Sequence, residues 1–204
     1  MDDKSIIDKI TATASLCVLL LSFALLSGCQ TGTVEQSLTN SLAGNDPDTQ
    51  MEFWHSLAER PMTSNDEAFH GFLLFTDGTD SAADYGQRVE LLRSRQLLPA
   101  NFDRAADEAV LRGTMAVAIA RHLDIKGGVT MRLFGPTPRY ATRELQHKNL
   151  YPPCTPNQTF SGTEFLGIIG RIEDYQRVLH PMEDETMRKD DPEAPVEADK
   201  QADE

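Results

Sequence analysis

Cysteine is scarce in this sequence, with three residues in a chain of 204: Cys17, Cys29 and Cys154. The chain has no Cys-x-x-Cys pair and no two histidines at helical spacing, so the usual ligand pattern of a zinc site is missing. Cys17 lies in an apolar N-terminal run, and a lipid on Cys29 would leave Cys154 without a disulfide partner. We therefore predict no intrachain disulfide, no metal and no cofactor.

Positive charge is also scarce. Nineteen Lys and Arg stand against 32 Asp and Glu, and the formal net charge is −13. Residues 181–204 hold ten acidic and three basic side chains, which gives this tail a net charge of −7. A nucleic-acid partner needs a basic face that displaces counterions, so we expect no such partner. The tail has almost no large apolar residue to offset its chain entropy, and we predict that it is disordered.

Motifs of common enzyme classes are missing as well. The sequence contains no glycine-rich phosphate loop, no nucleophile elbow and no His-Glu-x-x-His. The five histidines are scattered, and Glu67 and Glu164 are explained by helix capping. We therefore predict no catalytic residues and expect that the protein is not an enzyme. The alternative is a small periplasmic enzyme or enzyme accessory protein that uses Cys154 or a histidine such as His147.

The one long apolar run lies at the N-terminus, over residues 12–27. It has about the length of a signal-peptide core and is short for a membrane-spanning helix. The run ends in Leu26-Ser27-Gly28-Cys29. This ending resembles the lipobox of bacterial lipoproteins, a family in which a diacylglycerol is attached to the cysteine thiol and a peptidase cuts before that cysteine.

The lipobox resemblance implies a signal peptide over residues 1–28, cleavage between Gly28 and Cys29, and acyl chains such as palmitate on Cys29. Each buried methylene adds roughly 0.8 kcal/mol, so several chains hold a protein firmly on a membrane. Residue Gln30 differs from the aspartate that resembles an inner-membrane retention signal. We expect a lipid-anchored envelope protein, on the periplasmic face of the outer membrane if the host has one. An uncleaved anchor helix is the alternative.

The remaining chain is divided by its hydrophobic periodicity. Residues 29–50 are polar and lack such periodicity, which predicts a flexible linker. Residues 51–180 carry apolar side chains at helical spacing, which predicts a mainly α domain. Two capping-box patterns, Ser64 to Glu67 and Ser161 to Glu164, predict helix starts. Residues 129–134 alternate between apolar and polar and are bounded by glycine and proline, which predicts either a short β segment or an extended connector.

Parts of the domain repeat one another. Tyr85-x-x-Arg88 recurs as Tyr140-x-x-Arg143, and Leu97-Leu98-Pro99 recurs as Leu150-Tyr151-Pro152. A shorter version of the same pattern begins at residue 51. Because a single helix–loop–helix unit cannot bury its own apolar face, such units pack on one another. We therefore predict three packed helix–loop–helix units.

These three units resemble S-layer homology (SLH) modules, in which a short sequence box opens the second helix. The matching boxes are Ser64-Asn65-Asp66-Glu67, Leu111-Arg112-Gly113-Thr114 and Ser161-Gly162-Thr163-Glu164. The resemblance covers about residues 51–177 and implies non-covalent binding of a cell-wall polymer. The glycine-rich loop of the family is replaced here by proline-bearing loops. The chain also resembles envelope lipoproteins of planctomycete type, a likeness that implies no activity.

Arginines and tyrosines of the domain are the candidate binding residues. Guanidinium groups suit the carboxylates or phosphates of an anionic polymer, and tyrosine rings suit sugars. The candidates are Arg88, Arg112, Arg132, Arg139, Arg143, Tyr85 and Tyr140. Ordinary ion pairs of these arginines with Glu90, Asp103, Asp107 and Glu144 are the alternative. We predict a structural or adaptor role, in which the protein joins the membrane to a wall polymer or to another envelope protein.

Overall fold

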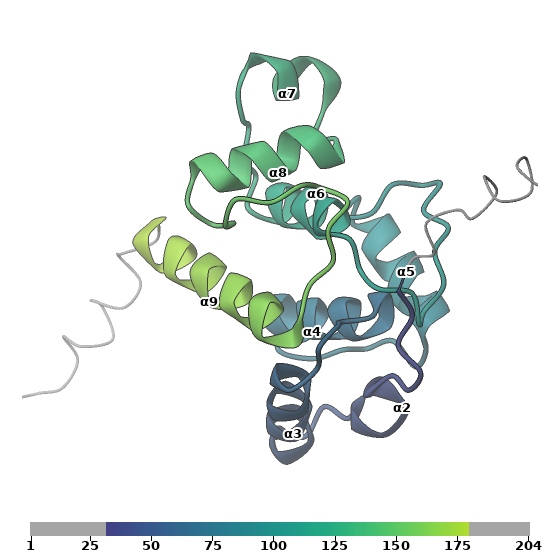
Figure 1. The fold of residues 1–204 in the computed structure, drawn as a ribbon. Helices are drawn as coiled ribbons and strands as arrows, with labels where there is room; N and C mark the ends of the chain where they lie inside the picture. Colours follow the sequence, from purple (N-terminus) through teal and green to yellow (C-terminus); the bar gives the residue numbers. More distant parts are fainter. Residues whose placement is uncertain (1–31, 180–204) are drawn as a thin grey trace, which may run out of the picture. The chain divides into compact units, whose positions relative to one another are not determined.

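The computed structural model describes residues 32–179 of the chain. The predicted signal peptide, Gly28, Cys29 and the acidic tail over residues 181–204 lie outside this range. Within it the fold is mainly helical, as predicted (Figure 1). The helices are α2 (Thr39–Leu42), α3 (Pro47–Ala58), α4 (Asn65–Asp77), α5 (Tyr85–Ser94), α6 (Arg112–His122), α7 (Val129–Phe134), α8 (Pro138–His147) and α9 (Gly162–Leu179). None of the helices in residues 32–179 has the length and apolar character needed to cross a membrane.

Helices α4, α6 and α9 begin next to one another. The Thr63 amide donates to the Phe160 carbonyl at 3.0 Å, and the Val110 amide donates to the Thr63 carbonyl at 3.0 Å. The Arg112 amide donates to the Gln158 carbonyl at 2.8 Å. We call these joined helix starts, residues 63–66, 109–113 and 158–162, the hub. The hub brings together the three boxes that the sequence repeat marks.

Two of the three hub helices begin with a capping box, as the sequence predicts. The Ser64 hydroxyl accepts from the Glu67 amide at 3.1 Å, and the Glu67 carboxylate accepts from the Ser64 amide at 2.9 Å. Ser161 and Glu164 form the same pair of hydrogen bonds, at 3.2 and 2.9 Å. Helix α6 begins at Arg112, and its N-cap residue, Leu111, makes no side-chain capping hydrogen bond. Reciprocal capping satisfies amides that the first helical turn leaves without a partner.

The start of α9 lies against the end of α3 with no room for a side chain. The Gly162 amide donates to the Arg60 carbonyl at 2.9 Å. A Cβ atom added to Gly162 would lie 1.5 Å from the Leu57 carbonyl oxygen. Glycine therefore permits the approach that closes the hub on the α3 side.

Helices α5 and α8 each end in a turn of the same type. Each is followed by a residue in the left-handed conformation, Gln96 (φ 60°) and Asn149 (φ 59°). The Leu97 amide then donates to the Leu92 carbonyl at 2.8 Å, and the Leu150 amide donates to the Leu145 carbonyl at 2.9 Å. These turns satisfy late helix carbonyls and carry Leu97 and Leu150 into the core. The Leu-Leu-Pro and Leu-Tyr-Pro repeats thus correspond to one repeated structural element.

The short β segment predicted near residues 129–134 is wrong, because this stretch is helix α7. The Arg132 amide donates to the Gly128 carbonyl at 3.1 Å, a helical bond that needs no neighbouring strand. Met131 is the only residue of α7 whose side chain is buried. The alternation in the sequence therefore reflects apolar side chains that face solvent rather than the two faces of a strand.

The flexible linker predicted over residues 29–50 is also wrong for the part that the structure describes. The Val34 amide donates to the Asp107 carbonyl at 2.8 Å, and the Val34 side chain is buried. The Leu38 amide donates to the Glu67 carboxylate at 3.0 Å. Asp46 caps α3, which begins at Pro47. The partners of this segment are distant in sequence, so local periodicity does not reveal that it packs on the domain.

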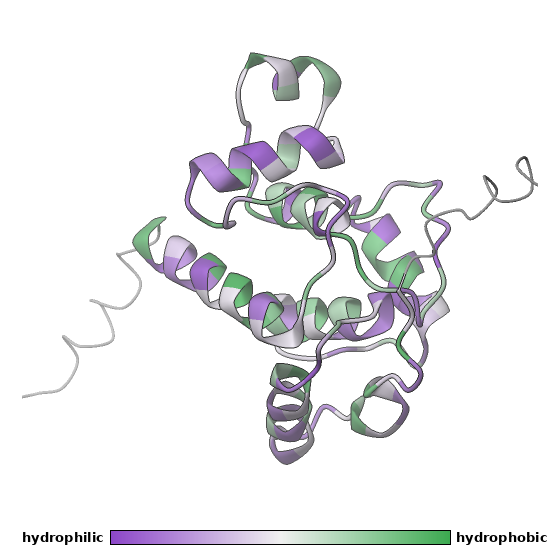
Figure 2. Ribbon diagram, in the orientation of Figure 1, coloured by the Kyte–Doolittle hydropathy of each residue, from purple (hydrophilic) through white to green (hydrophobic). Residues whose placement is uncertain are grey.

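The core lies among the hub helices and the helices around them. Its largest fully buried apolar side chains include five phenylalanines, Phe53, Phe69, Phe72, Phe160 and Phe165. Figure 2 shows hydrophobic residues on α4, α6 and α9 and also on the outlying α7. Helices α6 and α8 pack side by side, and α7 lies beyond α8 (Figure 1). This arrangement leaves α7 and one side of α8 as a separate exposed face.

Candidate functional site

Arg88, a predicted binding residue, lies in the core and is only 2% exposed. Its Nε atom donates to Asp80 Oδ2 at 2.5 Å, and its Nη1 atom donates to Asp66 Oδ1 at 2.6 Å. A buried guanidinium with two carboxylate partners cannot reach a polymer. The binding role predicted for Arg88 is therefore corrected: the residue joins α5 to α4 and to the segment between them.

Asp80 is the centre of this buried cluster. His70 Nδ1 lies 2.6 Å from Asp80 Oδ2, and the Asn45 side-chain oxygen accepts from the Asp80 amide at 2.7 Å. Burial raises the pKa of the Asp80 carboxyl, but hydrogen bonds from His70 and Arg88 outweigh burial, and the pKa lies below its ordinary value. No motif in the sequence indicates this cluster, because its two acids, Asp66 and Asp80, are 14 residues apart.

Arg112 is likewise engaged within the fold. Its Nε atom donates to the Thr159 carbonyl at 2.9 Å, and its Nη2 atom lies 2.5 Å from Glu164 Oε1. The guanidinium carbon is 4.9 Å from the centre of the Phe160 ring. The Ser161 amide, and then the Arg112 guanidinium, lower the pKa of Glu164 against the opposing effect of burial. Arg112 lines a polar cavity of about 480 Å³, but its charge is already paired, so we no longer count it as a binding residue.

The two candidate tyrosines are partly buried. The Tyr85 hydroxyl donates to the Arg104 carbonyl at 2.8 Å, and the Tyr85 ring stacks on Phe69 with a centroid distance of 5.9 Å. Burial raises the pKa of Tyr85 well above its ordinary value. Tyr140 packs against the core. Tyr85 thus has one ring face and its hydroxyl engaged within the fold, and Tyr140 is half-buried, so sugar stacking by these two rings stays a prediction.

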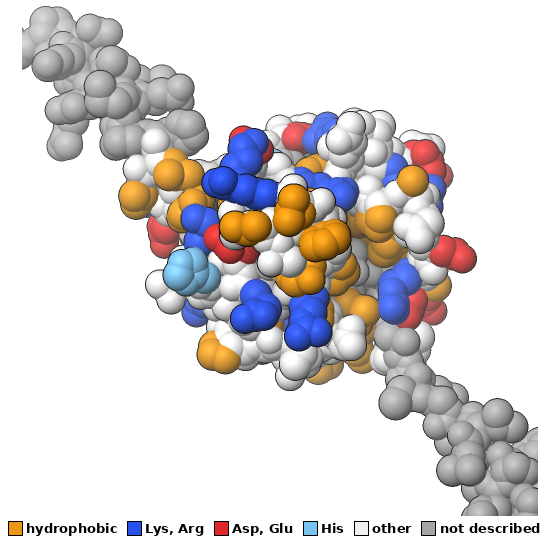
Figure 3. All heavy atoms as spheres, turned by 90° about the horizontal axis from the view of Figure 1, so that it is seen from above, with side chains coloured by type: hydrophobic (Ala, Val, Ile, Leu, Met, Phe, Trp, Pro, Cys, Tyr) orange, Lys and Arg blue, Asp and Glu red, His pale blue; other side chains and the backbone are white. Residues whose placement is uncertain are grey.

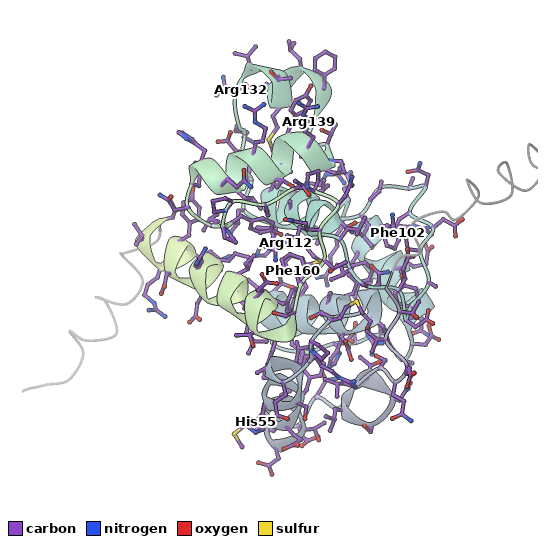
Figure 4. The ribbon with its side chains drawn as sticks, viewed as in Figure 1. His55, Phe102, Arg112, Arg132, Arg139 and Phe160 are labelled. Carbon is purple, nitrogen blue, oxygen red and sulfur yellow. The ribbon has the colours of Figure 1, made fainter. Side chains whose placement is uncertain are left out.

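Three of the predicted arginines remain on the surface: Arg132 on α7, and Arg139 and Arg143 on α8. None of the three forms an ion pair with an acid in the described part of the chain. Arg139 and Arg143 are four residues apart and so share one side of α8. Figure 4 shows Arg132 and Arg139 in the region of α7 and α8, away from the buried Arg112 and Phe160.

Large apolar side chains lie among these arginines. Val129 is 74% exposed, Leu133 is 73% exposed and Phe134 is 69% exposed. Figure 3, which looks down on α7, shows basic side chains around a group of hydrophobic ones. We call this surface the α7–α8 face, made of Val129, Arg132, Leu133, Phe134, Arg139 and Arg143. Exposed apolar surface of this kind is typical of an interaction site.

The structure brings Cys154 to a glutamine rather than to a histidine. Gln146 Nε2 lies 3.4 Å from Cys154 Sγ and donates to the Cys154 carbonyl at 2.8 Å. Cys154 is partly buried, whereas the neighbouring His147 is exposed at the end of α8. No hydrogen bond joins Cys154 to His147 in residues 32–179. Nor do these residues contain a group of three or more side chains placed to hold a metal ion.

The structure thus defines a mainly helical domain with a central hub and one exposed face that is both basic and apolar. Comparisons with protein families, with curated proteins and with solved structures found no match for this chain.

Proposed function

We propose that this protein is a lipid-anchored adaptor of the cell envelope that binds an anionic wall polymer through the α7–α8 face. The observation that supports this proposal is the set of three exposed arginines without an acidic partner among residues 32–179. The lipobox resemblance at Cys29 supports the anchor. In this role the protein holds a polymer close to the membrane and performs no covalent chemistry.

The chemistry of the face suits such a ligand. A guanidinium group binds a carboxylate or phosphate through two parallel hydrogen bonds, which gives orientation as well as attraction. Arg139 and Arg143 lie roughly 6 Å apart along one side of α8, a spacing that permits contact with successive anionic groups. A single exposed ion pair contributes little to the binding free energy. Binding therefore depends on several arginines that contact the same polymer molecule together.

Sedimentation with purified wall sacculi tests the proposal. The full chain in a neutral detergent is mixed with sacculi and the mixture is centrifuged. The amount of protein in the pellet is then measured. We expect saturable binding that weakens with added salt, because exposed charges are screened. The double substitution Arg139→Gln and Arg143→Gln should raise the Kd about tenfold, since two charge-assisted contacts are lost.

The matched control is Arg171→Gln, which removes an exposed arginine of α9. This variant should bind as the unaltered chain does. Absence of the unaltered chain from the pellet would overturn wall binding. Equal weakening by the α8 double substitution and by Arg171→Gln would show a general charge effect instead of a site.

A further inference from the structure

Two adjoining cavities open along α6. The larger has a volume of about 560 Å³, and four cationic side chains contribute to its lining: Arg95, Arg121, Lys126 and Arg132. The smaller has a volume of about 280 Å³ and a mainly apolar lining that includes Phe102, Val117, Phe134 and three prolines. Arg121 and Pro136 line both cavities. A cationic space and an apolar space therefore meet at one half-buried arginine.

The fold explains why these two spaces adjoin. Thr114, Val117 and Arg121 follow helical spacing along one side of α6 and form the floor. The loop after α5 supplies one wall, and the segment from α7 to α8 supplies the other. Gly135, with φ of 74°, turns the chain between α7 and α8. Figure 4 labels Phe102 and Arg132, one residue from each wall.

Two of the four cations have no acidic partner in the described range. Arg95 pairs with Asp77 at 2.7 Å, and Lys126 pairs with Asp124 at 2.5 Å. Arg121 donates only to the Gln96 carbonyl, and Arg132 forms no ion pair with residues 32–179. The cationic cavity therefore holds two guanidinium charges that an anionic group would neutralise.

We propose that the two cavities form one binding site for a small amphiphilic anion, a single apolar chain that ends in a phosphate or a carboxylate. The head group binds between Arg121 and Arg132, and the chain lies against Phe102, Val117 and Phe134. Phe134 is 69% exposed without a ligand, so a chain in the groove would cover apolar surface. The site shares Arg132 and Phe134 with the α7–α8 face, but Arg121, Val117 and Phe102 lie outside that face, so variants of Arg121 and Val117 test this inference separately from wall binding.

Photolabelling tests this site in the full chain. The protein is held in nanodiscs of zwitterionic lipid and irradiated with decyl phosphate that carries a diazirine at the end of its chain. We expect saturable labelling within residues 99–102, 114–121 or 134–138, located by mass spectrometry. Unlabelled decyl phosphate and decanoate should compete, and the stronger competitor identifies the preferred head group. Decanol and inorganic phosphate should each compete at least tenfold less, because each lacks half of the ligand.

Variants separate the two halves of the site. Arg121→Gln should reduce labelling about tenfold through loss of a charge-assisted contact, and Arg121→Lys should restore part of it. Val117→Trp should reduce labelling by filling the apolar cavity while all four cations remain. Arg171→Gln is the control for a lost exposed charge and should label normally. Circular dichroism of each variant confirms that it is folded.

Three results would overturn the inference. The first is equal labelling of folded Arg121→Gln, folded Val117→Trp and the unaltered chain. The second is equal competition by decanol and decyl phosphate, which would show an apolar site without anion recognition. The third is labelling that occurs only after residues 181–204 are deleted, which would show that the acidic tail occupies the groove. Loss of sacculus binding alone would not count against this site.

Discussion

At the scale of single residues, two arginines that share one sequence motif have opposite environments. Arg88 and Arg143 follow the same Tyr-x-x-Arg pattern, yet Arg88 is buried between Asp66 and Asp80, and Arg143 is exposed. Removing one partner of a buried ion pair leaves an uncompensated charge in the core. Substitutions at these two positions should therefore change the free energy of unfolding by different amounts.

Arg88→Met should lower the free energy of unfolding by about 3–5 kcal/mol, because it leaves two buried carboxylates without their cation. Arg143→Met, the matched substitution on the surface, should change it by less than about 0.5 kcal/mol. Urea denaturation of both variants at neutral pH provides the comparison. Similar losses for the two variants would contradict the structural role that we assign to Arg88.

His122 gives the protein a pH dependence of its own. His122 is the last residue of α6 and lies beside the Phe72 and Phe75 rings of α4. Its burial there lowers the pKa of the imidazole, although Asp77 opposes this effect. The folded state therefore prefers neutral His122, while the unfolded state titrates near the ordinary value of 6.5. Its contribution to stability is complete above pH 6.5 and is lost as the pH falls toward the folded pKa.

The corresponding measurement is the difference in unfolding free energy between the unaltered chain and His122→Asn over pH 7.5 to 5.5. The unaltered chain should lose more stability than the variant as the pH falls. Comparing the two chains cancels the shared contributions of other titrating groups. A difference that is independent of pH, or that grows with falling pH in favour of the unaltered chain, would contradict the prediction.

At the scale of elements, the three glycines of α9 have different roles. A Cβ atom at Gly162 would lie within bonding distance of the Leu57 carbonyl oxygen, whereas one at Gly167 or Gly170 would have no neighbour within 4 Å. Gly162→Ala should therefore lower the unfolding free energy by about 3 kcal/mol or more through overpacking. Gly167→Ala should raise it by about 0.5–1 kcal/mol, because alanine favours the helix interior. Thermal denaturation should move the two midpoints in opposite directions, and a shared direction would contradict the close packing at the hub.

The sequence predicted elements best where the signal and the structure are both local. The capping boxes at Ser64 and Ser161 satisfy amides within three residues, so four letters of sequence are enough to predict a helix start. The segment around Val34 depends on Asp107, and Arg88 depends on Asp66 and Asp80, so their environments require the whole fold. For the same reason, sequence alone could name the candidate arginines but not show that only Arg132, Arg139 and Arg143 are exposed.

At the scale of the whole molecule, the proposed membrane location depends on Cys29, which lies outside the described residues. If the lipobox resemblance holds, Cys29→Ala should leave an unprocessed chain that lacks acyl groups. Mass spectrometry of the mature N-terminus distinguishes the two forms directly. The unaltered chain should begin at an acylated Cys29, and an unacylated chain that begins at Met1 would favour the uncleaved anchor.

The hub also sets the order in which the domain completes itself. The three segments of the hub follow one another at intervals of about fifty residues. The last of them, residues 158–162, is synthesised last. Contacts of such long sequence separation slow closure, since loop entropy is lost before they form. A chain that ends at residue 157 lacks the Phe160 and Gln158 carbonyls and should unfold without a cooperative transition in urea. If the chain is exported unfolded, as the lipobox resemblance implies, this late closure would leave it unfolded until residues 158–162 have been synthesised.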